Sequence, residues 1–224
     1  MAYKSSAAIP TARVEAWRAL NGPLLEINLF GDTECREFLR LHFEAHVVER
    51  FEFIRHGPIK ADFFRAHYLY RKGGVYADVD MVPLLPIDQF VDRAKDAFLM
   101  PLTDTSVSQP FNPTFVAVRP QHPFMEVLCS LYSMLPLQTY SYWSWSIVTL
   151  TTAMDEFARA RTSQRLREQH RLDDSTKHPE ALHSRAADFE EMVIRDQATG
   201  AAVLRVRDSS YDIAQHAFLQ PKPG

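Results

Sequence analysis

Residues 59–86 read IKADFFRAHYLYRKGGVYADVDMVPLLP, and this stretch decides most of what the sequence predicts about the fold. A proline at the start and the Gly73–Gly74 pair at the end are typical of helix boundaries, so we expect a helix over 58–71. Residues 75–82 are rich in β-branched side chains, which predicts a short strand that Pro83 prevents from continuing. The stretch therefore predicts a helix that folds back beside a strand.

Two carboxylates, Asp78 and Asp80, lie at the end of this predicted strand. Side chains at i and i+2 of a strand point the same way, and two like charges so close are costly unless a cation lies between them. Mg²⁺ and Mn²⁺ accept carboxylate oxygens and keep positions open for water and phosphate. The pair predicts a metal site that neutralises a diphosphate. The alternative is a pair of solvated turn residues, because Asp-x-Asp also occurs by chance.

Asp62 and Arg65 are three residues apart on the predicted helix, so they share one face. The glycine turn would bring this face beside Tyr76 and the two aspartates. A carboxylate and a planar guanidinium suit the recognition of sugar hydroxyls and the support of a phosphate. A surface ion pair is the alternative interpretation.

The rest of the chain alternates predicted strands and helices. Strands are expected at 24–30, 97–101, 114–118, 193–195 and 202–206, and helices at 32–46, 123–134 and 144–161. This alternation predicts a single α/β domain over 1–224, with a mostly parallel central sheet flanked by helices. The polar run 162–183 is expected to be a mobile surface segment or a solvated helix.

Composition narrows the function classes. A net charge of -3 offers no basic balance for nucleic-acid binding. Cys35 and Cys129 form no disulfide framework and are expected to be small buried residues. No apolar stretch has the length of a secretory signal or a membrane span. We therefore expect a soluble chain that associates with membranes only through an anchor outside this sequence; Golgi lumen and cytoplasm both fit.

The spacing of four motif elements resembles the signature of glycosyltransferase family 32. These elements are Asp62, Arg65, residues 73–76 (GGVY) and residues 78–80 (DVD). These are the glycosyltransferases whose sugar-binding region contains an Asp-x-Asp (DXD) motif, and they include mannosyltransferases and enzymes of capsular polysaccharide synthesis. The spacing is also similar to that in the glucosyltransferase domains of large clostridial toxins. A looser resemblance covers residues 16–43 and 112–123.

The resemblance implies the GT-A fold of nucleotide-diphospho-sugar transferases and a hexosyltransferase that retains anomeric configuration. The donor would be GDP-mannose or a UDP-hexose, and the acceptor a glycan, a lipid or a protein. By this analogy Asp62 and Arg65 contact the donor sugar, Tyr76 and Asp78 contact the ribose or the metal site, and Asp80 binds Mn²⁺ or Mg²⁺.

Further residues enter through the same resemblance. Asn112 is a candidate substrate contact or a loop cap, and His216 is a candidate metal or phosphate ligand or an ordinary histidine. His122, before a proline, matches the family pattern without an assigned role. The family's usual first strand, of the type Ile-Pro-x-x-Ile-His-Gln-x-Trp, is not found after Ile9–Pro10, so the strand beneath the nucleotide base is expected to be missing.

The sequence leaves open the role of one aromatic cluster and two alternatives to the transferase function. Tyr140, Tyr142, Trp143 and Trp145 would stack on acceptor sugars or form core. The chain could be a non-catalytic nucleotide-sugar or carbohydrate-binding relative of the same fold. A phosphatase of the haloacid dehalogenase type, with Asp78 as nucleophile, is disfavoured because that loop lies near the start of a domain.

Overall fold

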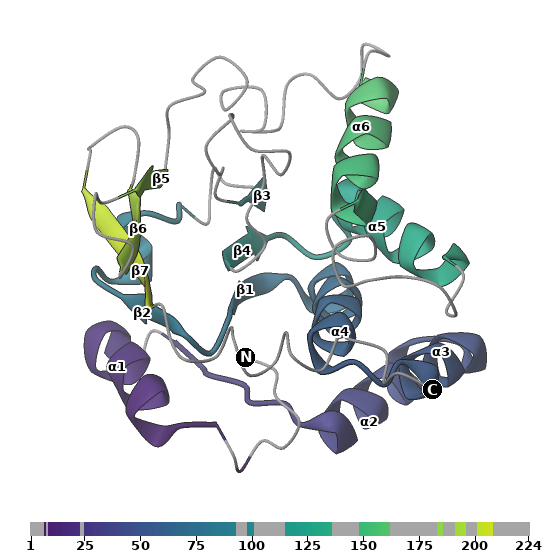
Figure 1. The fold of residues 1–224 in the computed structure, drawn as a ribbon, viewed down its shortest axis with the longest axis horizontal. Helices are drawn as coiled ribbons and strands as arrows, with labels where there is room; N and C mark the ends of the chain where they lie inside the picture. The colour runs from purple at the N-terminus through teal and green to yellow at the C-terminus, as the bar shows by residue number, and fades with distance from the viewer. Residues whose placement is uncertain are drawn as a thin grey trace, which may run out of the picture.

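The computed structural model describes residues 7, 9–22, 25–92, 98–100, 115–135, 148–161, 183–185, 191–195 and 201–207. Over these residues there are α-helices and short strands (Figure 1). The helices are α1 (Thr11–Asn21), α2 (Asp32–His42), α3 (Ala45–Phe53), α4 (Gly57–Lys72), α5 (Pro123–Met134) and α6 (Thr149–Arg161), with a 3₁₀ turn at Ile87–Gln89. The strands are β1 (Gly74–Ala77), β2 (Met81–Pro83), β3 (Phe98–Leu99), β4 (Phe115–Val118), β5 (His183–Arg185), β6 (Glu191–Arg195) and β7 (Ala202–Arg207).

The reversal between α4 and β1 follows the sequence prediction. Pro58 lies in the first turn of α4, where its missing N–H costs no hydrogen bond. At the other end Gly73 adopts φ 64° and its N–H donates to the Leu69 carbonyl at 2.8 Å. Gly74 follows with φ 97°, another value that favours glycine. The two glycines thus end α4 and turn the chain into β1, which confirms the predicted helix and turn.

Two other predictions have mixed outcomes. Helix α5 has the predicted bounds, and β6 pairs with β7 in the predicted late hairpin. The helix expected over 32–46 is instead divided into α2 and α3. The break occurs because Phe43 has extended backbone, φ -136° and ψ 167°, while its ring packs near Phe38 at 6.5 Å between centroids.

The expected parallel sheet is not found in the part of the chain that the structure describes. One sheet has the order β1-β4-β3 and the other the order β2-β7-β6-β5, and every described pair is antiparallel. Alternation of strands and helices along a sequence does not decide which strands pair. Here β4 lies between β1 and β3 and runs opposite to both, so the mostly parallel sheet is a wrong prediction for these residues.

The strand expected over 24–30 is also not formed as predicted. Residues 25–29 are assigned neither helix nor strand, and Phe30 makes only an isolated bridge. Burial nevertheless alternates along this segment: Leu25, Ile27 and Leu29 are half-buried, whereas Glu26 and Asn28 are exposed. The segment has the side-chain pattern of a strand without a strand's ladder.

Two apolar clusters hold these elements together. The larger joins α2, α3, α4, α5 and α6 to the face of β1 and β4 that carries Tyr76 and Val116. The smaller joins Trp17 of α1 to the opposite face, through Ala77 and Ala117, and to β2 and β7. Cys35 and Cys129 are buried free thiols, as predicted. None of the described helices is long and apolar enough to cross a membrane.

Candidate functional site

Arg65 lies at the centre of a polar cluster beneath β1. Its side chain is 8% exposed and forms a buried ion pair with Asp62, which is one turn earlier on α4 and 5% exposed. Nη1 of Arg65 is 3.8 Å from Oδ1 of Asp78, and its guanidinium lies 4.8 Å from the centroid of the Tyr76 ring. The structure therefore brings together Asp62, Arg65, Tyr76 and Asp78, four residues that the sequence singled out.

Local geometry explains how these side chains meet. Asp62 and Arg65 share a face of α4, and their neighbours Phe63 and Phe64 are buried in the large core cluster, which fixes the helix. Across the glycine turn, Tyr76 and Asp78 are two residues apart and lie on one side of the extended chain. The Tyr76 hydroxyl donates to Oδ1 of Asp78 at 2.5 Å.

The surroundings of Asp78 disfavour its charged form. Burial raises the pKa of Asp78 to about 7, and repulsion from Asp80 and Asp62 adds to this, while Arg65 and the Tyr76 hydroxyl act in the opposite direction. Burial disfavours the charged form of Arg65 too, but attraction to Asp62, Tyr76 and Asp78 outweighs it and raises the pKa of Arg65. The guanidinium stays charged among carboxylates that outnumber it.

Asp78 and Asp80 do not lie on one straight strand, contrary to the sequence prediction. Strand β1 ends at Ala77, and the N–H of Met81 donates to the Asp78 carbonyl at 3.1 Å to close a turn that contains Val79 and Asp80. The chain turns here because Met81 must enter β2 and pair with β7. Both carboxylates thus belong to one tight turn, residues 78–81, which we call the acidic turn. This turn, and not a straight strand, brings them close together.

The carboxylates of the acidic turn are candidate ligands for a metal ion. Within the described residues, no group of three or more His, Cys, Asp or Glu side chains is arranged to hold a metal ion. Mg²⁺ and similar ions are often bound through one or two protein carboxylates, with substrate phosphate and water completing the shell. Asp78 and Asp80, two hard oxygen donors in one tight turn, fit that mode of binding.

Several other predicted residues have different outcomes. Asn112, His216 and the aromatic cluster 140–145 lie outside the described residues, as does the polar run 162–182. His122 is described and is 4% exposed; its Nδ1 accepts from the Phe124 N–H at 3.2 Å, and its ring stacks on Phe98. His122 therefore caps α5 and packs in the core, away from a catalytic role.

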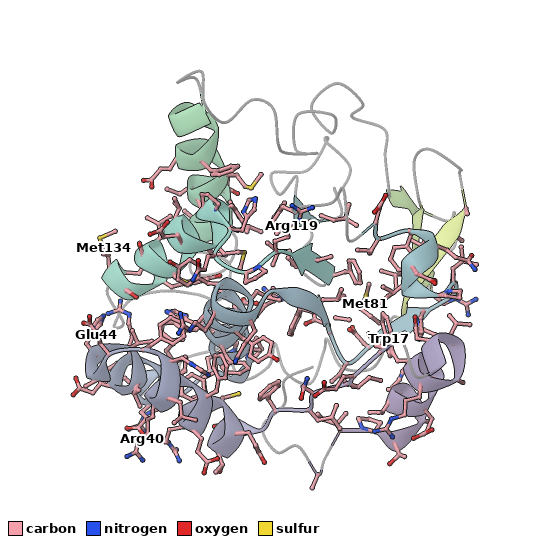
Figure 2. The ribbon with its side chains drawn as sticks, turned by 180° about the vertical axis from the view of Figure 1, so that it is seen from behind. Trp17, Arg40, Glu44, Met81, Arg119 and Met134 are labelled. Carbon is pink, nitrogen blue, oxygen red and sulfur yellow. The ribbon has the colours of Figure 1, made fainter. Side chains whose placement is uncertain are left out.

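Sequence reasoning missed two residues that hold the chain at the end of the acidic turn and shortly after it. Nε1 of Trp17 donates to the Met81 carbonyl at 3.1 Å, and the two side chains lie together in Figure 2. The Asn21 side chain accepts from the N–H of Ile87 at 2.8 Å and donates to the Trp17 carbonyl. These partners lie 64 and 66 residues away in sequence, so no local pattern links them. The one available signal was Trp17 itself, because tryptophan side chains are highly buried on average.

Residues 8–97 match the family model described as "Glycosyltransferase sugar-binding region containing DXD motif". This segment resembles that sugar-binding region. It contains α1, α4, β1 and β2 and all of Asp62, Arg65, Tyr76, Asp78 and Asp80, so the family resemblance stated from the motif is confirmed over these residues.

Two relatives are initiation-specific alpha-1,6-mannosyltransferases. The one from Candida albicans is 37% identical over 49 residues, which is 22% of this chain and 13% of the relative. The one from Saccharomyces cerevisiae is 29% identical over 83 residues, 36% of this chain and 17% of the relative. The chain thus spans under a fifth of either relative. No solved structure gives a significant match to this chain.

Proposed function

We propose that this chain is a glycosyltransferase that moves a hexose from a nucleotide sugar to a glycan, lipid or protein acceptor, with Mn²⁺ or Mg²⁺ held at Asp78 and Asp80. The observation that carries the proposal is the cluster of buried Asp62, Arg65 and Tyr76 with half-buried Asp78, which lies inside the segment similar to the sugar-binding region.

Charge balance supports a cation at the acidic turn. Two carboxylates, Asp62 and Asp78, share the one guanidinium of Arg65. Burial, with repulsion from Asp80 and Asp62, raises the pKa of Asp78, so its anion is less stable there than in water. A divalent cation would stabilise this anion, and when bound it would also neutralise the leaving diphosphate.

Each protein group has a separate task in this proposal. The Tyr76 hydroxyl fixes the orientation of Asp78, as outer groups do for ligands at metal sites. Arg65 keeps the carboxylates together and presents positive charge toward the donor. Oδ2 of Asp62 is buried and has no hydrogen-bond partner among the described residues. A donor-sugar hydroxyl would satisfy this acceptor.

The two residues outside the described part keep the roles expected for them. Val206 of β7 pairs with Met81, so β7 ends beside the acidic turn, and His216 follows nine residues after Arg207 in the sequence. By the family resemblance we keep His216 as a third metal or phosphate ligand. Asn112 remains a candidate substrate contact. By analogy with the family, transfer would retain configuration, with the leaving diphosphate accepting the acceptor's proton.

The proposal is tested by turnover of purified protein with a panel of GDP- and UDP-hexoses in the presence and absence of Mn²⁺. GDP-mannose is the first donor to try, because both relatives are mannosyltransferases. Asp80→Asn should abolish Mn²⁺-dependent release of nucleoside diphosphate and leave the fold intact. Asp88→Asn, at an exposed position shortly after the acidic turn, is the matched control and should turn over like wild type. Wild-type turnover by Asp80→Asn would refute the metal assignment.

A non-catalytic binding protein is the second candidate, favoured by the missing first-strand motif. It predicts saturable binding of the nucleotide sugar, measured by calorimetry, without release of nucleotide even when acceptors are added. Turnover by wild type, lost in Asp80→Asn, would exclude it.

A further inference from the structure

Strand β2 follows the acidic turn, and its backbone groups face alternately toward β7 and away from it. The N–H of Leu84, just after β2, donates to the Val203 carbonyl at 2.9 Å, so these two residues form a hydrogen-bonded pair. Hydrogen-bonded and non-hydrogen-bonded pairs alternate along antiparallel strands. Because Met81 lies opposite Val206 in the same register, this pair is of the non-hydrogen-bonded kind. The N–H and carbonyl of Met81 therefore point away from β7.

Both of these groups of Met81 are used where the acidic turn ends. The N–H donates to the Asp78 carbonyl at 3.1 Å and closes the turn, while the carbonyl accepts from Nε1 of Trp17 at 3.1 Å. Met81 is 0% exposed and Trp17 is 3% exposed, so water does not compete for this second bond. The indole of α1 is thus bonded across the core to the residue that closes the turn.

The acidic turn needs this hold because its own charges oppose its closure. Asp78 and Asp80 lie in the same turn, where like charges repel. Among the described strands, β2 lies at an edge of its sheet and has only three residues, of which Pro83 has no N–H to donate. Without the indole the buried Met81 carbonyl would lose its hydrogen bond, and an unpaired buried carbonyl is costly enough to displace the chain.

Helix α1 is itself fixed, so Trp17 offers its N–H from a defined place. Asn21, the last residue of α1, is 7% exposed. Its Oδ1 accepts from the N–H of Ile87 at 2.8 Å, and its Nδ2 donates to the Trp17 carbonyl at 2.9 Å. The helix is therefore tied to the 3₁₀ turn after β2 by its last residue and to the end of the acidic turn by Trp17, one helical turn earlier.

We propose that Trp17 is a positioning residue for the metal and diphosphate site, because its indole N–H holds the Met81 carbonyl and thereby keeps the carboxylates of Asp78 and Asp80 together for one divalent cation. In this role Trp17 acts through the backbone of Met81 and not by contact with the donor. The role rests on the proposed function, since it concerns the same two carboxylates. The hold on the turn itself is independent of any metal and is measured separately.

Hydrogen exchange of the metal-free protein tests the hold on the turn. Trp17→Phe keeps a buried aromatic ring and removes the donor, so the N–H of Met81 should exchange about ten-fold faster relative to that of Leu69 in α4. Phe90→Leu is the matched control, because Phe90 is 8% exposed in the same apolar cluster and its loss removes packing but no bond to the turn. The ratio of the two exchange rates should stay as in wild type in this control. An unchanged ratio in Trp17→Phe would overturn the proposal.

Binding of Mn²⁺ in the presence of a nucleoside diphosphate, followed by the electron paramagnetic resonance of free Mn²⁺, tests the consequence for the site. Trp17→Phe should bind Mn²⁺ about ten-fold more weakly, as when outer groups that orient metal ligands are removed, and Phe90→Leu should bind like wild type. If Trp17→Phe does not fold, benzothienylalanine at position 17 keeps the bicyclic ring and replaces the N–H by sulfur. Wild-type Mn²⁺ affinity without the N–H would overturn the positioning role and leave the proposed function standing, whereas no Mn²⁺ binding by the wild-type protein would overturn both.

Discussion

Two arginines with the same local spacing have very different surroundings. Arg65 pairs with Asp62 and Arg18 pairs with Glu15, each three residues apart on a helix. The Arg65 pair is almost fully buried, whereas the side chains of Arg18 and Glu15 are 54% and 56% exposed. Water and salt screen the exposed pair, but they reach the buried pair little. Spacing in the sequence identifies both pairs, and burial alone decides which one matters.

Arg65→Ala should lower the free energy of unfolding by about 3 kcal/mol at pH 7, because it leaves buried Asp62 and half-buried Asp78 without their cation. Arg18→Ala is the matched control and should cost a few tenths of a kcal/mol. Urea unfolding followed by circular dichroism measures both. Equal, small losses would show that Arg65 does not hold the cluster together.

Tyr76→Phe removes only the hydroxyl that donates to Asp78. We expect Mn²⁺ to bind about ten-fold more weakly, in the range found when outer hydrogen bonds to metal ligands are removed. Titration calorimetry with Mn²⁺ and a nucleoside diphosphate measures the change. Tyr68→Phe, at a ring of α4 that packs against Phe30 and Phe38, is the control and should bind Mn²⁺ like wild type. Unchanged affinity in Tyr76→Phe would refute the role of its hydroxyl.

At the scale of the element, the turn between α4 and β1 needs glycine for two reasons. Gly73 has φ 64°, and a Cβ built there would lie 2.6 Å from both N and Cδ of Pro120 and 2.8 Å from the Val118 carbonyl oxygen. Backbone atoms cannot move aside as the end of a flexible side chain can. The close approach is held in place by the N–H of Gln121, which donates to the Tyr70 carbonyl at 2.6 Å.

Gly73→Ala should therefore destabilise the protein by about 2 kcal/mol or more, through positive φ and steric overlap together. Gly57→Ala, at the first residue of α4 with open space around its Cβ, is the matched control. It should be neutral or slightly stabilising, since alanine favours helix. Thermal melts of both variants give the comparison, and similar melting temperatures would contradict the proposed crowding.

Elements with local signals were the ones that the sequence predicted well. Proline and glycine bound α4, and His122–Pro123 begins α5. The strand at 24–30 and the straight strand through Asp80 failed because pairing depends on partners far away in sequence. Met81 turns toward β7, more than a hundred residues later, and residues 25–29 have no strand partner within the described chain. Of the candidate site, the α4–β1 half was predictable, and the Trp17 and Asn21 contacts were not.

At the scale of the whole molecule, a buried histidine links global stability to pH. His67 is 1% exposed on α4, stacks on Phe63 at 4.2 Å, and its Nδ1–H donates to the Phe63 carbonyl at 2.7 Å. Burial lowers the pKa of His67 to about 4, and repulsion from His46 adds to this, against the hydrogen bond to Phe63. The folded protein thus keeps His67 neutral at a pH where the unfolded chain protonates it.

The direction of the effect follows from proton binding. Between pH 6.5 and about 4 the unfolded chain binds a proton at His67 and the folded protein does not, so stability falls as pH falls. Above pH 6.5 both states are neutral, and below about 4 both are protonated. The His67 contribution between pH 7.5 and 5 should therefore be a loss of about 2 kcal/mol. Urea midpoints at the two pH values measure it, with His67→Gln as the control that cannot titrate. The variant starts less stable because ring packing is lost, but its stability should fall less with acid; parallel losses in both proteins would show that His67 is not the titrating group.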